Sequence, residues 1–474
     1  MKKIVAVVFG ILSIALADAK VTLPSLISDN MVLQQSSEVL LWGVASPNTD
    51  VKITASWQTG PVTVKSDKSG EWNAYITTPS AGGPYRLVFD DGEETVVENV
   101  MTGEVWLCSG QSNMVMPMNG FKNQPVEGAM DYIVSAKKSQ PIRICNIKRA
   151  TPFEPVPSCR AVWYENTPEA VSEASATAYF FARKLQETLN VPVGVIVTSW
   201  GGSKVKAWMS RETLQQFSDE VDLSVLDTKV KPKDPQHAPC LLYNGMLAPL
   251  QNYAIKGFVW YQGCSDIDNS ELYSRLFPSF VNMLRSMWKN ETMPFYYVQI
   301  APFQYSGNDN IEAAKIREVQ MKGLETIPNS GMVVTMDCGD EFGIHPGKKK
   351  PVGDRLAYLA LQKTYGIKGI DAMAPIYKSH KIKGDKVYVT MTCSPRGVGP
   401  KGHSLEGFEI AGEDKVFYPA EAMIRSDVGV VEVKSDSVKN PIAVRYAFKN
   451  VAPASMFSTY GIPASPFRTD NWND

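Results

Sequence analysis

The sequence predicts an α/β protein in which a central parallel sheet carries a smaller β region on either side. Over residues 101–370, short apolar runs alternate with longer helical patterns, which is typical of parallel strands joined by helices. Residues 20–100 and 371–474 instead show short alternating runs separated by turn residues, as antiparallel β-structure does. A chain of 474 residues has room for about three domains of ordinary size.

The N-terminal region, residues 20–100, predicts a small antiparallel β-sandwich. Residues 39–42, 51–54 and 85–89 are short β-rich runs, and turn clusters at 46–48 and 67–70 separate them. This spacing of short strands is the pattern of a sandwich rather than of a helical domain.

The central region contains five apolar runs that we expect to be strands and two clear helical patterns. The strands are expected at 105–108, 195–198, 257–261, 295–300 and 332–336, and the helices at about 172–189 and 350–364. Residues 117–170 are rich in proline, and we expect loops there that cover one edge of the sheet. The β runs at 387–391, 429–433 and 442–448 belong either to a third domain or to a β layer on the second.

The first 19 residues predict a secretory signal peptide. Lys2 and Lys3 precede an apolar run over 4–16, and Ala17-Asp18-Ala19 supplies a small-x-small cleavage site. No later stretch approaches the roughly 18 apolar residues that a membrane-spanning helix needs. We therefore expect an exported protein, in the periplasm or outside the cell.

Composition excludes several classes of function. Lys and Arg number 48 against 49 Asp and Glu, so the basic excess of a nucleic-acid-binding protein is missing. The seven cysteines are odd in number and irregularly spaced, which argues against a disulfide framework, although Cys145 and Cys159 could pair. No C-x-x-C or H-E-x-x-H spacing occurs, so a zinc site has little support. We expect no metal or organic cofactor.

Polar clusters follow three of the five expected strands, at 109–114, 199–203 and 262–266. The fifth strand continues into the acidic stretch 337–341, and His345 follows. Because ligands bind beyond the carboxyl ends of the strands in an open parallel sheet, these segments should meet at one edge.

These residue types are the parts needed for acyl transfer. Ser112 is the candidate nucleophile and His345 the candidate base. The backbone N–H groups of Ser112 and Gly202, with the side chains of Gln111 and Gln262, are the candidates for oxyanion and substrate contacts. The other three histidines are weaker candidates. His237 is expected in a solvated turn, and His380 lies among lysines. His403 follows a glycine-rich turn in the C-terminal β region, where it is either a loop residue or part of the lining of a substrate cleft.

The motifs resemble a known family. The stretch 103–114 (GEVWLCSGQSNM) resembles the nucleophile block of the sialate O-acetylesterase family, within the SGNH hydrolase superfamily. Further blocks of similar order and spacing lie at 29–34, 199–203, 260–263, 344–349 and 463–470. The resemblance implies a flavodoxin-like SGNH catalytic domain with β accessory regions, and hydrolysis of O-acetyl esters on sugars, with sialic acid the family's typical substrate. It also implies Ser112 as nucleophile, His345 as base, and Gly202 and Gln262 in the oxyanion hole.

The acid that should orient the histidine is missing from its usual place. The superfamily carries an aspartate two or three residues before the histidine, where this chain has Gly343 and Phe342. We expect Asp340 to take this role, with Glu341, Asp337 or a backbone carbonyl as alternatives.

A second carboxylate is also absent, because the family's Gln-Gly-Glu is here Gln262-Gly263-Cys264. Two alternatives therefore stand beside a carbohydrate O-acetylesterase. One is a weakened or non-catalytic relative that binds glycans, and the other is an esterase for another polysaccharide, such as acetylated xylan. The oligomeric state has no signature in the sequence.

Overall fold

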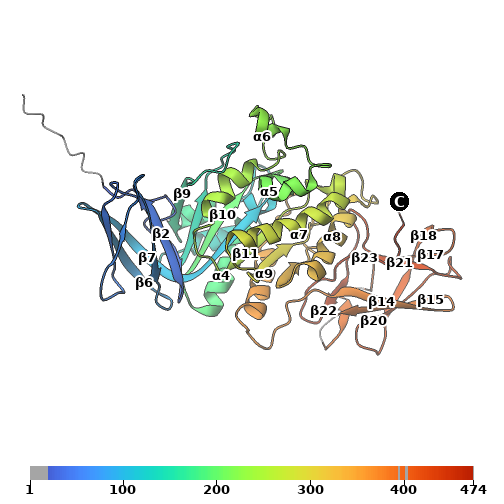
Figure 1. Ribbon diagram of the computed structural model, residues 1–474. Helices are drawn as coiled ribbons and strands as arrows, with labels where there is room; N and C mark the ends of the chain where they lie inside the picture. The colour runs from blue at the N-terminus through green and yellow to red at the C-terminus, as the bar shows by residue number, and fades with distance from the viewer. Residues whose placement is uncertain (1–19, 393–394, 401–403, 473–474) are drawn as a thin grey trace, which may run out of the picture.

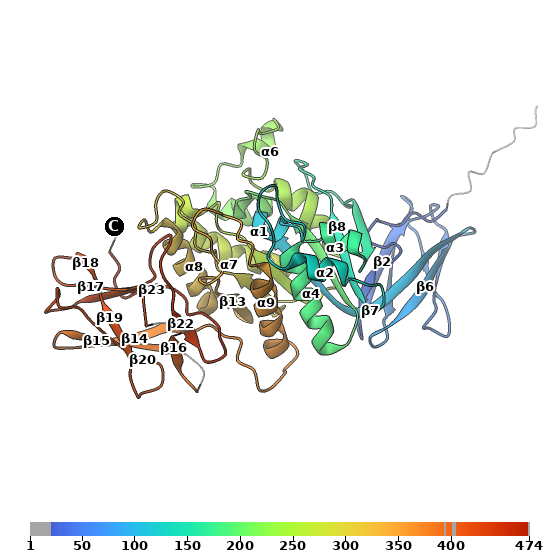
Figure 2. The same cartoon turned by 180° about the vertical axis from the view of Figure 1, so that it is seen from behind.

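The computed structural model describes residues 20–392, 395–400 and 404–472. A central α/β body lies between two β regions at opposite ends of the molecule (Figures 1 and 2). The expected leader, 1–19, and His403 lie outside the described residues.

The central sheet has the strand order β13–β12–β11–β7–β10–β8–β9. All neighbours are parallel except β8 and β9, which are antiparallel. In chain order, β7, β10, β11, β12 and β13 give the arrangement 2-1-3-4-5, a doubly wound order. The strands are β7 (Glu94–Gly110), β8 (Ile142–Ile147), β9 (Ala161–Glu165), β10 (Val193–Ser199), β11 (Gly257–Tyr261), β12 (Phe295–Val298) and β13 (Ser330–Val333). The predicted α/β class with a mostly parallel central sheet is confirmed.

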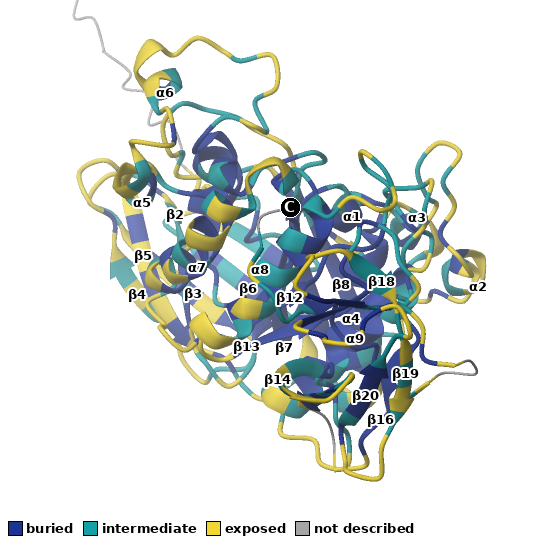
Figure 3. Ribbon diagram, turned by 90° about the vertical axis from the view of Figure 1, so that its right-hand side faces the viewer, coloured by how far each residue is buried: buried dark blue, intermediate teal, exposed yellow. Residues whose placement is uncertain are grey.

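Helices cover both faces of this sheet, because its strands are apolar on both sides. Trp260 and Tyr261, adjacent in β11, enter separate buried clusters on opposite faces. Figure 3 shows the strands buried beneath the helices, with exposed residues gathered in the outer loops. One face carries α4 (Ala176–Leu189) and α9 (Lys349–Lys363), and the other carries α7 (Ser270–Met287) and α8 (Glu312–Thr326).

The segment 117–170 differs from its prediction as loops. It supplies β8 and β9, which extend the central sheet beyond β10, and two short helices. β8 is a short run buried at five of its six positions, and such a run carries too little periodicity to reveal a strand among prolines. The short helices of the central body are α1 (Ser112–Val115), α2 (Ala129–Val134), α3 (Pro168–Glu173), α5 (Arg211–Leu214) and α6 (Ser224–Thr228).

The N-terminal β region shares a strand with the central sheet. β7 pairs with β6 along its first half and with β10 and β11 along its second. The expected boundary at residue 100 therefore falls inside one continuous strand. The remaining strands are β1 (Val32–Gln34), β2 (Glu38–Val44), β3 (Asp50–Ala55), β4 (Val62–Lys65), β5 (Glu71–Thr77) and β6 (Gly82–Asp90).

The C-terminal β region forms sheets of its own. One contains β14 (Ile376–Lys383), β15 (Lys386–Thr392), β19 (Glu421–Ile424) and β20 (Val430–Lys434). A second contains β17 (Phe408–Ala411), β18 (Phe417–Pro419), β21 (Ala443–Tyr446) and β23 (Phe467–Arg468). β16 (Val398–Pro400) pairs with β22 (Met456–Ser458).

A buried arginine joins the C-terminal region to the central body. Arg317 of α8 donates to the carbonyl oxygens of Lys449 at 2.7 Å, Asn450 at 2.9 Å and Ile300 at 3.0 Å. It has no exposed surface, so burial lowers its pKa to about 10 and the carbonyl dipoles take the place of water.

Two further observations bear on the sequence predictions. The six cysteines of the described residues are all free, Cys145 and Cys159 among them. Within the same residues, no helix combines the length and apolar character that crossing a membrane requires.

We expect Arg317→Met to lower the free energy of unfolding in urea by about 2–4 kcal/mol, because three or more buried carbonyls lose their donor. Lys322→Met, on an exposed position of the same helix, is the control and should change stability by less than about 0.5 kcal/mol. Equal stability of the two variants would contradict the docking role of Arg317.

Candidate active site

Ser112 lies where β7 passes directly into α1, at the carboxyl edge of the central sheet. Gly110 makes this turn possible, because its φ is +141° and a Cβ there would lie 2.2 Å from the carbonyl oxygen of Tyr261. The N–H of Gln111 then donates to that same carbonyl at 2.9 Å. The serine is thus fixed over the ends of β7 and β11, and it remains partly accessible.

The loop after β10 lies directly against Ser112. The N–H of Trp200 donates to the carbonyl of Gly110 at 3.1 Å, which pins this loop to the nucleophile turn. A Cβ built on Gly201 would be 3.4 Å from Cβ of Ser112. The structure therefore brings the first two polar clusters together, with Gly202 at the same loop.

His345 also reaches this edge, through the residue beside the nucleophile. Asn113 Nδ2 donates to the carbonyl of Ile344 at 3.0 Å, and Asn113 Oδ1 accepts from Nζ of Lys349 at 2.5 Å. Lys349 is fully buried, and burial lowers its pKa to about 7. One buried asparagine thus connects α1, which begins at Ser112, to both ends of the histidine loop, residues 344–349.

The side chain that orients His345 is Gln124. Its Oε1 lies 2.8 Å from Nδ1 of the imidazole, and the Phe121 ring packs edge-on against the imidazole at 5.1 Å. Because an amide oxygen accepts, Nδ1 carries the proton and Nε2 is the basic nitrogen. The loop is held in place by the N–H of Glu127, which donates to the carbonyl of Gly347 at 3.0 Å.

Asp340 does not take the place that we expected for it. It is exposed, and its Oδ1 accepts from the N–H of Phe342 at 2.9 Å in a local turn. The alternative Asp337 is held by Arg355 at 2.6 Å. The other alternative, Glu341, accepts from Asn308 at 2.6 Å. The Nδ1–H of His345 therefore donates to a neutral amide where a carboxylate was expected to accept.

The pKa of His345 follows from this neutral environment. Burial and, less strongly, the positive charge of Lys349 lower it from 6.5 to about 4. A carboxylate at Nδ1 would oppose both effects, but Gln124 carries no charge. The imidazole is consequently in its neutral, proton-accepting form at physiological pH.

Gln111 and Gln262, the two glutamines predicted to contact the oxyanion or the substrate, form hydrogen bonds within the protein instead. Gln262 is fully buried, and its Nε2 donates to the carbonyl of Ser203 at 3.0 Å and to Oδ2 of Asp266 at 2.5 Å. Both amide hydrogens are thereby used, so this arrangement does not support Gln262 as an oxyanion donor. Gln111 accepts from the N–H of Gly263 at 3.0 Å, which closes the same turn.

The remaining described histidines differ in their distance from the site. His237 is exposed, and its Nε2 lies 4.0 Å from where a Cβ on Gly202 would be. The sequence placed it in a solvated turn, and no local motif signals that this turn reaches the rim of the site. His380 lies in β14, where its Nδ1 bonds to the hydroxyl of Tyr377 at 2.8 Å.

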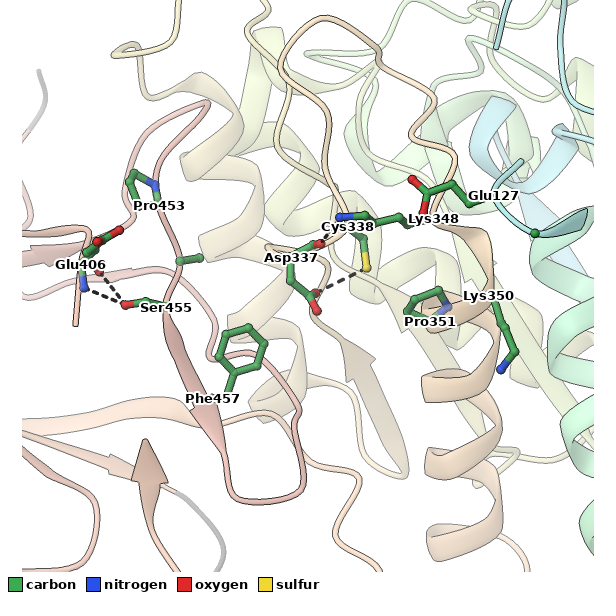
Figure 4. Close-up of a pocket in the computed structure, with 12 residues that line it drawn as sticks. Glu127, Asp337, Cys338, Lys348, Lys350, Pro351, Glu406, Pro453, Ser455 and Phe457 are labelled. Atoms are coloured by element: carbon green, nitrogen blue, oxygen red, sulfur yellow. Dashed lines mark hydrogen bonds between the residues drawn. The ribbon is translucent and has the colours of Figure 1, made fainter. Parts of the chain in front are cut away.

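A cavity of about 720 Å³ lies beside the histidine loop, between the central body and the C-terminal region (Figure 4). Asp337 and Lys348 face it from one side, and Glu406 and Phe457 face it from the other. Neither Ser112 nor His345 is among the residues that line it. The cavity is therefore next to the histidine loop and is lined by side chains of both charges.

A serine, a neutral imidazole and a glycine loop at the carboxyl edge of a doubly wound sheet are compatible with the class of hydrolases. Comparison with known proteins narrows this class. Residues 102–362 match the family model described as carbohydrate esterase, sialic acid-specific acetylesterase. The chain therefore belongs to this carbohydrate esterase family, and it is a carbohydrate O-acetylesterase.

Individual relatives agree with this assignment. A crystal structure of a carbohydrate acetylesterase from Xanthomonas citri is similar at a TM-score of 0.86 and 33% identity, covering 95% of this chain and 100% of that one. Sialate O-acetylesterase of Pongo abelii is 30% identical over 404 residues, covering 78% of this chain and 76% of the relative. The protein of the same name from Homo sapiens is 29% identical, with the same coverage.

The neutral partner of His345 predicts an acid-tolerant pH profile. The base works only when neutral, so kcat/KM for an aryl acetate should fall as the pH drops through about 4 and stay level from about pH 5.5 to 7. In Gln124→Glu, a carboxylate next to Nδ1 favours the imidazolium and should move this limb up by at least about one pH unit.

Asn123→Asp is the matched control for that variant, because it adds the same charge at the neighbouring, exposed position. Its acidic limb should move by less than about 0.3 pH unit, since exposed charges are screened. The orienting role of Gln124 is refuted if both variants shift the limb equally.

Proposed function

We propose that Ser112 and His345 cleave O-acetyl esters of sialic acid through an acetyl-serine intermediate. The observation that carries this proposal is the hydrogen bond from Asn113 to the carbonyl of Ile344, which holds the residues next to Ser112 and His345 together. The strand order 2-1-3-4-5 and the position of Ser112 at the end of the first of these strands also favour an SGNH-type hydrolase domain.

In the first step, Oγ of Ser112 attacks the acetyl carbonyl while Nε2 of His345 accepts the hydroxyl proton. The tetrahedral intermediate then collapses, the bond to the sugar oxygen breaks, and that oxygen takes the proton from His345. In the second step, water attacks the acetyl-serine, gives its proton to His345, and releases acetate as Ser112 recovers its proton.

The oxyanion is expected to be bound by backbone donors. The first N–H groups of a helix lack intrahelical acceptors, and Ser112 begins α1. The N–H of Gly202 belongs to the loop that contacts the serine. With the amide hydrogens of Gln262 already used, these backbone groups are the donors we assign to the developing charge.

Gln124 replaces the acid of a Ser-His-Asp triad in this mechanism. It fixes the tautomer through Nδ1, as the acid does, but it provides no charge to stabilise the imidazolium. We therefore assign catalysis to a Ser–His pair that a neutral amide orients.

A cation next to the site favours an anionic sugar. The Arg149 guanidinium carbon lies 5.1 Å from the centre of the Trp200 ring. Trp200 belongs to the loop that contacts Ser112. Sialic acid carries a carboxylate, and an arginine offers it a charge-assisted hydrogen bond. A neutral polysaccharide, such as neutral acetylated xylan, offers no carboxylate for this guanidinium to bind.

Ser112→Ala should lower acetate release from O-acetyl sialic acid and from an aryl acetate by at least about 10³-fold, because the nucleophile is lost. The control is Ser109→Ala, three residues earlier in β7, whose hydroxyl makes no hydrogen bond within the described residues. Wild-type turnover by the Ser112 variant, with the circular dichroism spectrum unchanged, would refute the assignment.

Arg149→Met should raise KM for O-acetyl sialic acid at least about tenfold, because the carboxylate loses a charged partner. Hydrolysis of the neutral aryl acetate should change by less than about twofold. Arg160→Met removes the same charge farther along the same cavity and serves as the control. An equal loss on both substrates would point instead to a neutral polysaccharide or to a structural role for Arg149.

A further inference from the structure

A second cavity, remote from Ser112 in the chain, lies between the N-terminal β region and the central body. Its volume is about 630 Å³, which is in the range of ligand sites. One wall is formed by β2 and β5, and the other by the segment 155–158 with residues around Tyr243 and Asn252. We propose that this cavity, the β2–β5 groove, binds neutral sugar units of the glycan whose acetyl group is removed at Ser112.

The β-strand wall combines an aromatic face with polar side chains. Trp42 of β2 lies directly opposite Asn73 of β5, and Val44 lies opposite Glu71. Cross-strand partners share one face of a sheet, so the indole, the amide and the carboxylate point the same way. Trp42 is only half-buried, and Asn73 and Glu71 are exposed.

This combination matches the surface of a sugar. A pyranose ring presents an apolar face of C–H groups and a rim of hydroxyls, each both donor and acceptor. An indole takes the apolar face, while amides and carboxylates bind neighbouring hydroxyls. The opposite wall adds Tyr243, Gln251 and Asn252, which supply a further aromatic ring and two amides.

A buried polar group at the cavity has no partner. Trp72 lines the groove and is 2% exposed, and its indole N–H makes no hydrogen bond within the described residues. Gly43 makes room for this ring, because a Cβ there would lie 2.9 Å from Cζ2 of Trp72. Trp72 alternates with Glu71 and Asn73 along β5, so its ring lies on the opposite side of the strand pair, where it packs against Phe89 at 5.7 Å between ring centroids. The wall that a sugar would meet is therefore the face of Trp42, Asn73 and Glu71.

The charge of the lining selects neutral sugars. Glu71 is its one ionisable carboxylate, and no lysine or arginine lines the cavity among the described residues. The groove therefore differs from the region of Arg149, to which we assign the sialic acid carboxylate.

A route connects the groove with the nucleophile. A third cavity, of about 920 Å³, is lined by Arg149 and shares the residues 156–158 with the groove. Arg149 in turn stacks on Trp200, beside Ser112. On this inference, a glycan whose terminal sugar lies at Ser112 extends past Arg149 toward the β2–β5 groove. This part of the inference rests on the proposed function of Ser112.

Binding should be measured on the Ser112→Ala protein, so that esterase activity does not enter the readout. The probes for calorimetry are cellotetraose, xylotetraose, lacto-N-tetraose and the anionic sialyllactose. We expect at least one neutral tetrasaccharide to bind, and the added change Trp42→Ala to weaken it at least tenfold. Asn73→Ala should weaken it less, because the aromatic face remains.

Trp57→Ala is the matched control in the same β region, since Trp57 donates to the Thr77 carbonyl and does not line the groove. It should leave the affinity within twofold. With Ser112 intact, Trp42→Ala should raise KM for an acetylated oligosaccharide and leave aryl acetate hydrolysis unchanged.

The inference is overturned if no neutral tetrasaccharide binds, or if binding is insensitive to Trp42→Ala. It is also overturned if sialyllactose binds more tightly than every neutral probe in a way that depends on Trp42. A failure of the esterase assignment would appear separately, as full turnover by Ser112→Ala, and would leave the binding result intact.

Discussion

The arrangement of the active site depends on one buried asparagine. Asn113 accepts from the buried ammonium group of Lys349 and donates to the carbonyl of Ile344. One hydrogen-bonded unit therefore joins α1, the histidine loop and α9. Each partner in this unit would be costly if left unpaired away from water. These hydrogen bonds fix the position of His345, because moving the histidine loop away would break them and lower the stability of the protein. The same ammonium group lowers the pKa of the imidazole, so the contact that places the base also tunes it.

The loop 117–128, which precedes α2, also helps to place His345. Gln124 reaches His345 from this loop, which the N–H of Glu127 anchors by donating to the carbonyl of Gly347. The absence of a carboxylate there has a chemical meaning. A Ser–His pair with a neutral orienting group has a weaker base, but the base stays unprotonated in mildly acidic surroundings. The neutral amide of Gln124 and the charge of Lys349 therefore both favour a low pKa for His345.

Much of this could be predicted from the sequence, because parallel strands deliver their carboxyl ends to one edge. Ser112, the loop at Gly201 and the approach of His345 follow from that rule. The partner of His345 could not be found in this way. Gln124 is 221 residues distant along the chain, in a segment without periodicity, whereas nearness in sequence points to Asp340. Gln262 illustrates a further limit, because residue type does not reveal which acceptors already occupy an amide.

The continuity of β7 has a consequence for the range of substrates. This strand runs for 17 residues from the N-terminal β region to the turn before Ser112 and is paired in both regions. A strand that is paired on both sides of a domain boundary leaves no hinge between them. The N-terminal region is therefore held at a fixed angle to the central body, and the proposed sugar groove stays at a constant distance from Ser112. On the proposed binding, the spacing between sugar and ester in a substrate has to match that distance for both to be held at once.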